Sequence, residues 1–158
     1  MWPNASLPDY SEAERGFNAE RLGKYSEAAD WYRKAGDRGN YQAQYRLGVL
    51  YYDGQRVTRD YTEALRWFQR AAELGFAAAQ YNLAAMYDNG FGVKQDAVEA
   101  MHWYRLAADQ GHVASQEHVG KMYEFGVGVP LDLNQARLWM QKAAASGDAN
   151  AKQWLAMH

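Results

Sequence analysis

The fold is decided by residues 60–75, which read Asp60-Tyr-Thr-Glu63-Ala64-Leu-Arg-Trp67-Phe68-Gln-Arg-Ala71-Ala72-Glu-Leu-Gly75. The stretch opens as a capping box, in which the side chain of Asp60 accepts from a free amide of the first turn and Glu63 reaches back. Apolar residues then recur at three- and four-residue spacing and form one stripe. Gly75 ends the helix because glycine adopts the left-handed conformation without penalty. An amphipathic helix is therefore predicted between Asp60 and Gly75.

This helix recurs every 36 residues along the chain. Four columns hold in four units: Trp31, Trp67, Trp103 and Trp139; Ala28, Ala64, Ala100 and Ala136; Ala35, Ala71, Ala107 and Ala143; and Gly39, Gly75, Gly111 and Gly147. Further columns hold in three units: Tyr51, Tyr87 and Tyr123; Gly54, Gly90 and Gly126; Val57, Val93 and Val129; and Asp60, Asp96 and Asp132. So many columns in one register predict a repeat architecture.

A second helix precedes this one in each unit. It is predicted from about Tyr41 to Asp53, with Tyr45, Leu47 and Gly48 among its marks. Gly48 is small because a neighbouring helix must come close at that point. The loop that joins the two helices holds glycines for positive φ and one valine that fills the space between the helices.

These units predict an all-α solenoid of antiparallel helix pairs. One pair cannot bury both its Trp face and its Tyr face, so neighbouring pairs must cover them and the stack curves into a superhelix. Each repeated Trp is accordingly interpreted as a wedge between helices. The predicted organisation is one repeat domain over 1–158, with an N-terminal tail at 1–8, a short first repeat at 9–40, full repeats at 41–76, 77–112 and 113–148, and a half-repeat helix at 149–158.

Composition excludes several classes of protein. A formal net charge of −2 and a sequence pI of about 6.1 are not typical of a nucleic-acid-binding protein. The chain has no cysteine, which excludes disulfides and thiolate metal sites. No apolar run approaches the roughly 20 residues of a membrane span. The expected compartment is the cytoplasm if the chain is complete, and the periplasm or the exterior if a leader has been removed.

The units resemble a known repeat. The carrying pattern is Leu47-Gly48-x-x-Tyr51-x-x-Gly54, then Val57-x-x-Asp60, then Ala64-x-x-Trp67-Phe68-x-x-Ala71-Ala72-x-x-Gly75, and it is similar to the Sel1-like repeat (SLR), a relative of the tetratricopeptide repeat. The resemblance covers residues 9–158 and implies a right-handed α-superhelix that serves bacterial or eukaryotic proteins as an adaptor or scaffold. It also implies that ligands lie in a concave groove lined by the first helix of each unit. The first repeat has the loop length of an ordinary tetratricopeptide repeat. Arg56 stands where the second glycine of the loop is usual, so that loop is expected to bend differently.

No constellation of side chains predicts catalysis, a cofactor or a metal site. His112 and His118 are six residues apart and straddle a helix start, so they do not share a helical face as a metal-binding pair would. Asp60, Asp96 and Asp132 recur as caps, and a residue repeated in every unit is structural because an active site is normally used once. No phosphate-binding glycine loop or nucleophile elbow occurs. We therefore expect no enzyme activity.

Function is expected where the units differ. On the first helices, the positions three before, one after and four after Gly48 and its equivalents should point into the groove. The predicted partner-binding residues are Phe17, Tyr45, Val49, Tyr52, Asp53, Tyr81, Ala85, Asp88, Asn89, Glu117, Lys121 and Glu124. A partner peptide or helix would use Phe17, Tyr45, Tyr52 and Tyr81 as apolar anchors. The alternative is that some of these tyrosines only pack between helices.

The leading interpretation is a non-catalytic scaffold or adaptor for a protein or peptide partner, with no role for nucleic acid. The alternative is a regulatory or inhibitory module that controls one partner enzyme. The C-terminal half-repeat carries Trp154, Leu155 and Met157, so this short apolar helix is a frayed cap, a truncated repeat or a self-association edge. The chain is accordingly expected to be a monomer or a weak homodimer through its C-terminal end.

Overall fold

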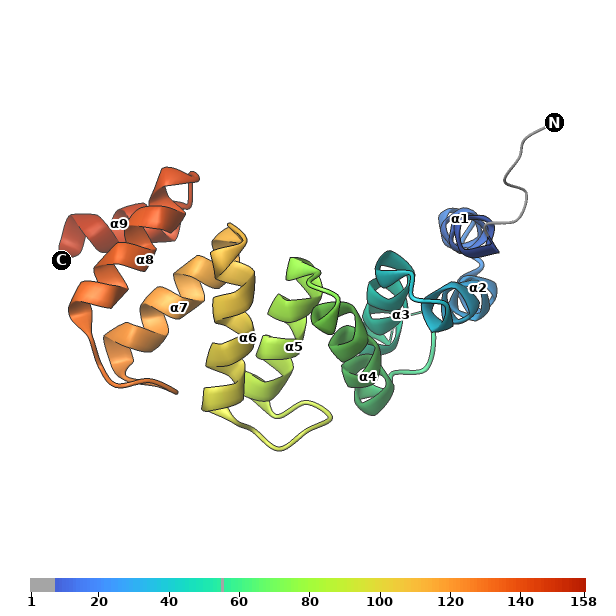
Figure 1. The fold of residues 1–158 in the computed structure, drawn as a ribbon, viewed down its shortest axis with the longest axis horizontal. Helices are drawn as coiled ribbons and strands as arrows, with labels where there is room; N and C mark the ends of the chain where they lie inside the picture. The colour runs from blue at the N-terminus through green and yellow to red at the C-terminus, as the bar shows by residue number, and fades with distance from the viewer. Residues whose placement is uncertain (1–7, 55) are drawn as a thin grey trace. The chain divides into compact units, whose positions relative to one another are not determined.

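A computed structural model describes residues 8–54 and 56–158, and the side chains of 12–54 and 56–158. Within these residues the regular elements are all α-helices (Figure 1), namely α1 (Pro8–Arg21), α2 (Tyr25–Asp37), α3 (Tyr41–Asp53), α4 (Tyr61–Glu73), α5 (Ala77–Asn89), α6 (Ala97–Asp109), α7 (Val113–Phe125), α8 (Leu133–Ala145) and α9 (Ala149–Met157). The all-α repeat prediction is confirmed, and so are the predicted limits of the helix from Tyr41 to Asp53. The predicted tail at 1–8 lies outside the described residues, apart from Pro8 at the start of α1.

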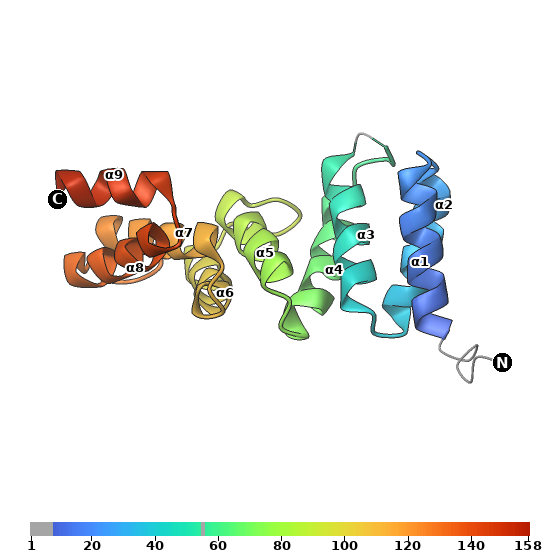
Figure 2. The same cartoon turned by 90° about the horizontal axis from the view of Figure 1, so that it is seen from above.

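The chain divides into two compact units, Met1–Leu74 and Gly75–His158, which are described separately. Unit 1 holds α1 to α4 and unit 2 holds α5 to α9. Within each unit, helices that are consecutive in sequence lie side by side, as the two views in Figures 1 and 2 show. No helix in the described part of the chain is both long enough and apolar enough to cross a membrane.

Glycine brings the two helices of a repeat into contact. A Cβ added at Gly48 in α3 would lie 2.7 Å from ring atoms of Phe68 in α4, and one added at Gly16 in α1 would lie 2.5 Å from the ring of Tyr32 in α2. Such distances are too short for carbon atoms, so the rings occupy the space that a side chain would need. This confirms the predicted reason for the small residue in this column.

Two of the repeated tryptophans lie between repeats. Trp67 is 2% exposed and Trp139 is 3% exposed. The guanidinium of Arg33 in α2 lies 5.8 Å from the Trp67 ring centroid, and the guanidinium of Arg105 in α6 lies 4.9 Å from that of Trp139. The wedge interpretation is therefore confirmed for these two residues. Trp31, in the first repeat, is only half-buried and its ring is covered by cations of its own repeat.

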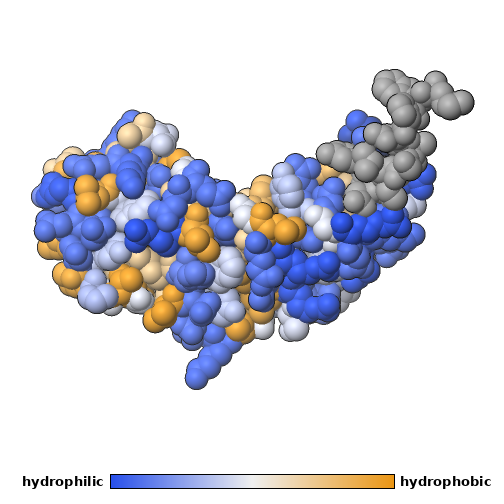
Figure 3. All heavy atoms as spheres, viewed as in Figure 1, coloured by the Kyte–Doolittle hydropathy of each residue, from blue (hydrophilic) through white to orange (hydrophobic). Residues whose placement is uncertain are grey.

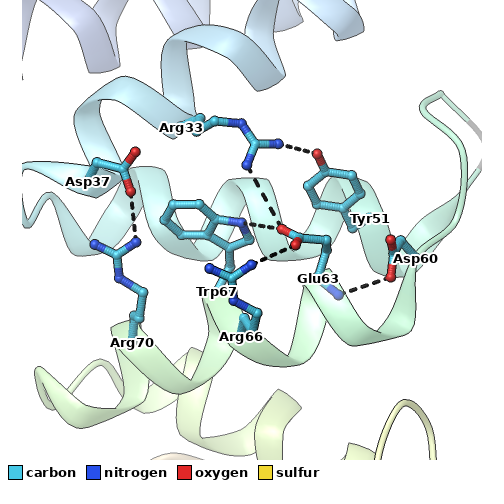
Figure 4. A network of polar contacts seen from close by, with 8 residues as sticks. All are labelled: Arg33, Asp37, Tyr51, Asp60, Glu63, Arg66, Trp67 and Arg70. Atoms are coloured by element: carbon cyan, nitrogen blue, oxygen red, sulfur yellow. Dashed lines mark hydrogen bonds and ion pairs between the residues drawn. The ribbon is translucent and has the colours of Figure 1, made fainter.

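Polar contacts fix the junction between the first two repeats (Figure 4). The Arg33 guanidinium donates to the Tyr51 hydroxyl, and the Glu63 carboxylate accepts from the Trp67 indole N–H at 3.2 Å and from Arg66 at 2.8 Å. Arg70 donates to Asp37 of α2 at 2.9 Å.

The contact between Arg33 and Tyr51 recurs 72 residues later, where Arg105 donates to the Tyr123 hydroxyl at 3.2 Å. The same geometry thus joins α2 to α3 in unit 1 and α6 to α7 in unit 2.

Only one of the two hydrogen bonds of each predicted capping box forms, namely the bond that the aspartate accepts. The side chain of Asp60 accepts from the amide of Glu63 at 3.0 Å, and Asp96 and Asp132 cap α6 and α8 in the same way. The returning bond of the box was predicted wrongly. The main-chain N–H of Asp60 instead donates to the carbonyl oxygen of Tyr51 at 3.0 Å, so no donor is left for the Glu63 carboxylate.

The loops follow the glycine pattern. Gly75, which follows the C-cap residue Leu74 of α4, has a φ of +89°, as predicted for the glycine at the end of this helix. In the loops of repeats 3 and 4, Gly92 and Gly128 both have a φ of +71°. Arg56 stands at the same position in repeat 2, where a side chain disfavours positive φ, so a different bend of this loop remains a prediction.

Candidate partner-binding faces

In unit 1, the predicted anchors form an aromatic face on the first helices. Phe17 of α1 is 37% exposed and packs edge-on against Tyr32, with ring centroids 5.4 Å apart. Tyr45 and Tyr52 of α3 both pack against Phe68 of α4, at 5.9 and 6.4 Å between centroids. The structure thus brings Tyr45 and Tyr52 to one buried ring while leaving Tyr52 36% exposed.

A charged pair lies beside these rings. The guanidinium of Arg46 lies 5.9 Å from the Phe17 ring centroid and 3.2 Å from the Glu20 carboxylate. Glu20 also accepts from the Tyr32 hydroxyl. Burial, and then the bond to Glu20, raise the pKa of Tyr32 above its usual value, so this phenol stays protonated. The face of unit 1 therefore presents aromatic surface next to a salt bridge that crosses from α1 to α3.

In unit 2, Tyr81 is the centre of an aromatic and imidazole cluster. Its ring centroid lies 5.6 Å from Tyr104, 5.0 Å from His112 and 5.6 Å from His118. His118 also stacks on Tyr104 at 4.8 Å. The two histidines do not share a helical face, as predicted, but they meet around one ring because His112 precedes α7 and His118 lies within it.

Each histidine has a defined polar role. The Nδ1 of His112 accepts from the main-chain N–H of Ser115 at 3.3 Å and is the N-cap of α7. Nδ1 of His118 lies 2.9 Å from the carbonyl oxygen of Ala114. Because a carbonyl oxygen can only accept, Nδ1 carries the hydrogen of this bond. Burial, and then the neighbouring His118, lower the pKa of His112, so its neutral form is favoured.

The charged residues of the fourth repeat are already engaged. Glu117 is buried, and its carboxylate lies 2.6 Å from the Lys121 ammonium. Glu124 lies 3.6 Å from the imidazole of His158, the residue directly after α9. Both carboxylates of this face therefore contact other side chains of the chain, and a partner would meet mainly the exposed Lys121.

The other predicted residues vary in exposure. Val49, Ala85 and Asp88 are half-buried, and Asp53 and Asn89 are exposed at the ends of α3 and α5. The Asn89 side chain donates to the carbonyl oxygen of Ala85 at 2.8 Å and so serves its own helix. On the side of each unit drawn in Figure 3, hydrophobic residues stand singly or in small groups among hydrophilic ones.

Sequence reasoning missed the histidines and Arg46 as members of these faces. His118 lies one position after Glu117, and Arg46 lies one position after Tyr45, so both fall outside the three columns expected to face the groove. Their long side chains reach the aromatic rings from the neighbouring positions. A signal was present in the first-helix positions, since charged or imidazole residues follow the groove column in repeats 2 and 4. Within the described residues, no three His, Asp or Glu side chains gather as a metal site would require.

A family model for the Sel1 repeat matches residues 14–40, 42–76, 77–112 and 113–148. The crystal structure of c5321, a protective antigen of uropathogenic Escherichia coli strains with an SLR fold, is 37% identical with a TM-score of 0.87, over 93% of this chain and 32% of that chain. A Sel1 repeat protein from Oxalobacter formigenes is 34% identical with a TM-score of 0.82, over 88% of this chain and 57% of that chain. This chain thus spans about a third to just over half of these relatives.

Helicobacter pylori cysteine rich protein B shares the fold, with a TM-score of 0.66 at 22% identity, over 84% of this chain and 96% of that chain. No curated protein matches the chain significantly.

Proposed function

Because the chain belongs to the Sel1 repeat family, whose members are generally protein–protein interaction modules, we propose that it is a non-catalytic scaffold or adaptor. It binds a partner peptide or helix on the first-helix faces of its units. Phe17, Tyr45 and Tyr52 are the anchors in unit 1, and Tyr81 is the anchor in unit 2.

The observation that supports this proposal is the way in which Tyr52 is held. Its ring is 36% exposed, yet it contacts Tyr61 at 5.5 Å and Phe68 at 6.4 Å between centroids. A ring that its neighbours already hold loses little conformational entropy when a partner covers it. Aromatic side chains of this kind are the usual anchors of protein interfaces.

The test starts from capture of a partner by the immobilised chain, identified by mass spectrometry and then purified. We expect the double variant Tyr52→Ala/Asp88→Ala to weaken binding of that partner at least about tenfold, since anchor residues cost about 2 kcal/mol or more when truncated. The matched control is Val98→Ala/Leu138→Ala, which removes exposed apolar side chains from second helices. Equal binding by both double variants, each folded by circular dichroism, would exclude the first-helix faces as the site.

A second candidate function is regulation of one partner enzyme. It differs from a scaffold only in its effect on the partner, so the discriminating measurement is turnover of the captured enzyme with and without a saturating amount of the chain. A changed turnover supports the regulatory module. An unchanged turnover with intact binding supports the scaffold.

A further inference from the structure

In repeat 3, a glutamine supplies the hydrogen-bond donor for the side-chain oxygen of a buried residue. The side-chain amide Nε2 of Gln110, at the end of α6, donates to the carbonyl oxygen of Gly75 at 2.9 Å and to Oε1 of Gln80 at 2.9 Å. Gln80 is buried at the start of α5. The carboxamide of Gln110 therefore satisfies a main-chain carbonyl and a buried side-chain oxygen together.

The corresponding contact is incomplete in repeat 2. Subtracting 36 gives Gly39 for Gly75, Gln44 for Gln80 and Leu74 for Gln110. Gln44 is 2% exposed, and its Nε2 donates to the carbonyl oxygen of Gly36 at 2.9 Å, but its Oε1 has no partner among the described residues. Leu74 cannot donate to it, and a buried amide oxygen without a donor is destabilising.

The fourth repeat supports this explanation. There the equivalent residue is Gln116, whose Oε1 also lacks a partner among the described residues, and Ser146 stands where repeat 3 has Gln110. The buried oxygen is thus paired where the third position carries a carboxamide, and unpaired where it does not.

In repeat 2, these positions line an open cleft of about 410 Å³. The other lining residues, here called the charged rim, are Asp37, Arg38, Arg70 and Glu73. The formal charges of the two acidic and two basic rim residues sum to zero. Each of these side chains also has an ion-pair or hydrogen-bond partner within unit 1. Asp37 pairs with Arg70 at 2.9 Å, Arg38 pairs with Glu12 at 3.5 Å, and Glu73 accepts from Gln69 at 3.0 Å.

We propose that this cleft binds a side-chain carboxamide, supplied by a glutamine or asparagine of a protein partner. Its NH₂ group donates to Oε1 of Gln44 and to the carbonyl oxygen of Gly39, as Gln110 does in repeat 3. The neutral rim favours a neutral ligand over a carboxylate or an amine. Leu74 is 58% exposed, so its side chain has room to turn aside when the ligand enters. None of the residues that line the cleft is among the predicted partner-binding residues of the first-helix faces. The carboxamide proposal can therefore be tested independently of the proposed function.

The first test uses N-acetylglutamine N′-methylamide as the probe and N-acetylmethionine N′-methylamide as the control, which is similar in size but lacks the NH₂ group. Titrations are followed by NMR of the ¹⁵N-labelled chain. We expect saturable shifts of the Gln44 side-chain amide and of the Gly39 amide with the glutamine probe, with a dissociation constant on the order of millimolar for so small a ligand. Equal shifts with both compounds, or none with either, would overturn the proposal.

Two variants sharpen the test. Leu74→Gln supplies the missing donor from within the chain, so the glutamine probe should no longer shift Gln44, whereas Leu74→Ala should keep the response. The reverse change, Gln110→Leu, should create a second site that is detected at Gln80. If Leu74→Gln binds the probe as before, or if Gln110→Leu gives no response at Gln80, the missing carboxamide does not define the site.

Discussion

The main-chain N–H of Asp60 donates to the carbonyl oxygen of Tyr51 at 3.0 Å, which ties the start of α4 to the last turn of α3. The same bond joins Asp96 to Tyr87 and Asp132 to Tyr123, each at 2.9 Å. One backbone bond over nine residues therefore closes the loop between the two helices of repeats 2, 3 and 4. This bond explains why the Tyr and Asp columns keep a constant spacing.

The closure bond predicts that only the aspartate of each capping pair contributes as a cap. Asp96→Ala removes an acceptor for the amides of Val98 and Glu99 and should lower the free energy of unfolding by about 1 kcal/mol. Glu99→Ala should change it by less than about 0.5 kcal/mol, because the Asp96 amide is already bonded to Tyr87. Urea unfolding measures both. A loss at Glu99 as large as that at Asp96 would mean that the full box forms in solution.

The helices were predictable because each repeat marks its own ends. In repeats 2, 3 and 4 an aspartate begins the second helix, in every repeat a glycine follows its end, and the register is repeated often enough to remove ambiguity. The returning half of the capping box was not predictable, because its donor is taken by a carbonyl group of the preceding helix. Local sequence patterns show which main-chain donor the Glu63 carboxylate could bond. The tertiary structure decides whether that donor already has another acceptor.

The candidate faces were predictable only in outline. The helical period places Tyr45 and Tyr52 on one face, and the structure does bring them to one ring. The meeting of His112 and His118 at Tyr81 depends on the turn before α7 and could not be read from their spacing. The unpaired side-chain oxygen of Gln44 could not be predicted from the sequence, because it is recognised only by comparison with the hydrogen bonds of its counterpart Gln80.

The glycine column predicts unequal tolerance of alanine. In Gly48→Ala the new methyl group would meet the rigid Phe68 ring at 2.7 Å, so overpacking should cost about 1–3 kcal/mol. Alanine gains up to about 1 kcal/mol in helix propensity, which offsets part of this cost. In Gly120→Ala the nearest atoms belong to the flexible Met140, at 3.1 Å, so the net change should be near zero. Thermal unfolding of both variants gives the comparison, and equal losses would contradict this packing argument.

Arg33 and Arg105 should each stabilise neighbouring repeats through a tyrosine and a tryptophan of the next repeat. Arg105→Met removes the cation from the Trp139 ring and the donor from the Tyr123 hydroxyl, and should cost about 1 kcal/mol. Tyr123→Phe removes only the hydrogen bond and should cost about 0.5 kcal/mol. In the Arg105→Met background the same change should cost nearly nothing, since its partner is absent. A double-mutant cycle in urea measures this coupling, and strict additivity would show that the bond contributes nothing.

His112 should make the stability of unit 2 depend on pH. Its pKa is lowered in the folded state by burial and by His118, so the unfolded chain binds the proton more readily. The free energy of unfolding should therefore be highest above the unfolded pKa of about 6.5 and fall as the pH drops from there through the folded pKa. Protonation of Nδ1 also removes the acceptor that caps α7 and places a positive charge at the positive end of the helix dipole.

The variant His112→Asn isolates this effect. Asn40 occupies the same position before α3 and caps it by accepting from the amide of Ala43 at 2.9 Å, so asparagine should preserve the cap of α7 without a titrating group. Urea unfolding at pH 7.5 and pH 5.5 should show a smaller loss of stability on acidification in the variant than in the parent chain. Control experiments with His102→Asn, an exposed histidine on α6, should leave the pH dependence as it is. If His112→Asn retains the full dependence, the titration that governs stability belongs to another group.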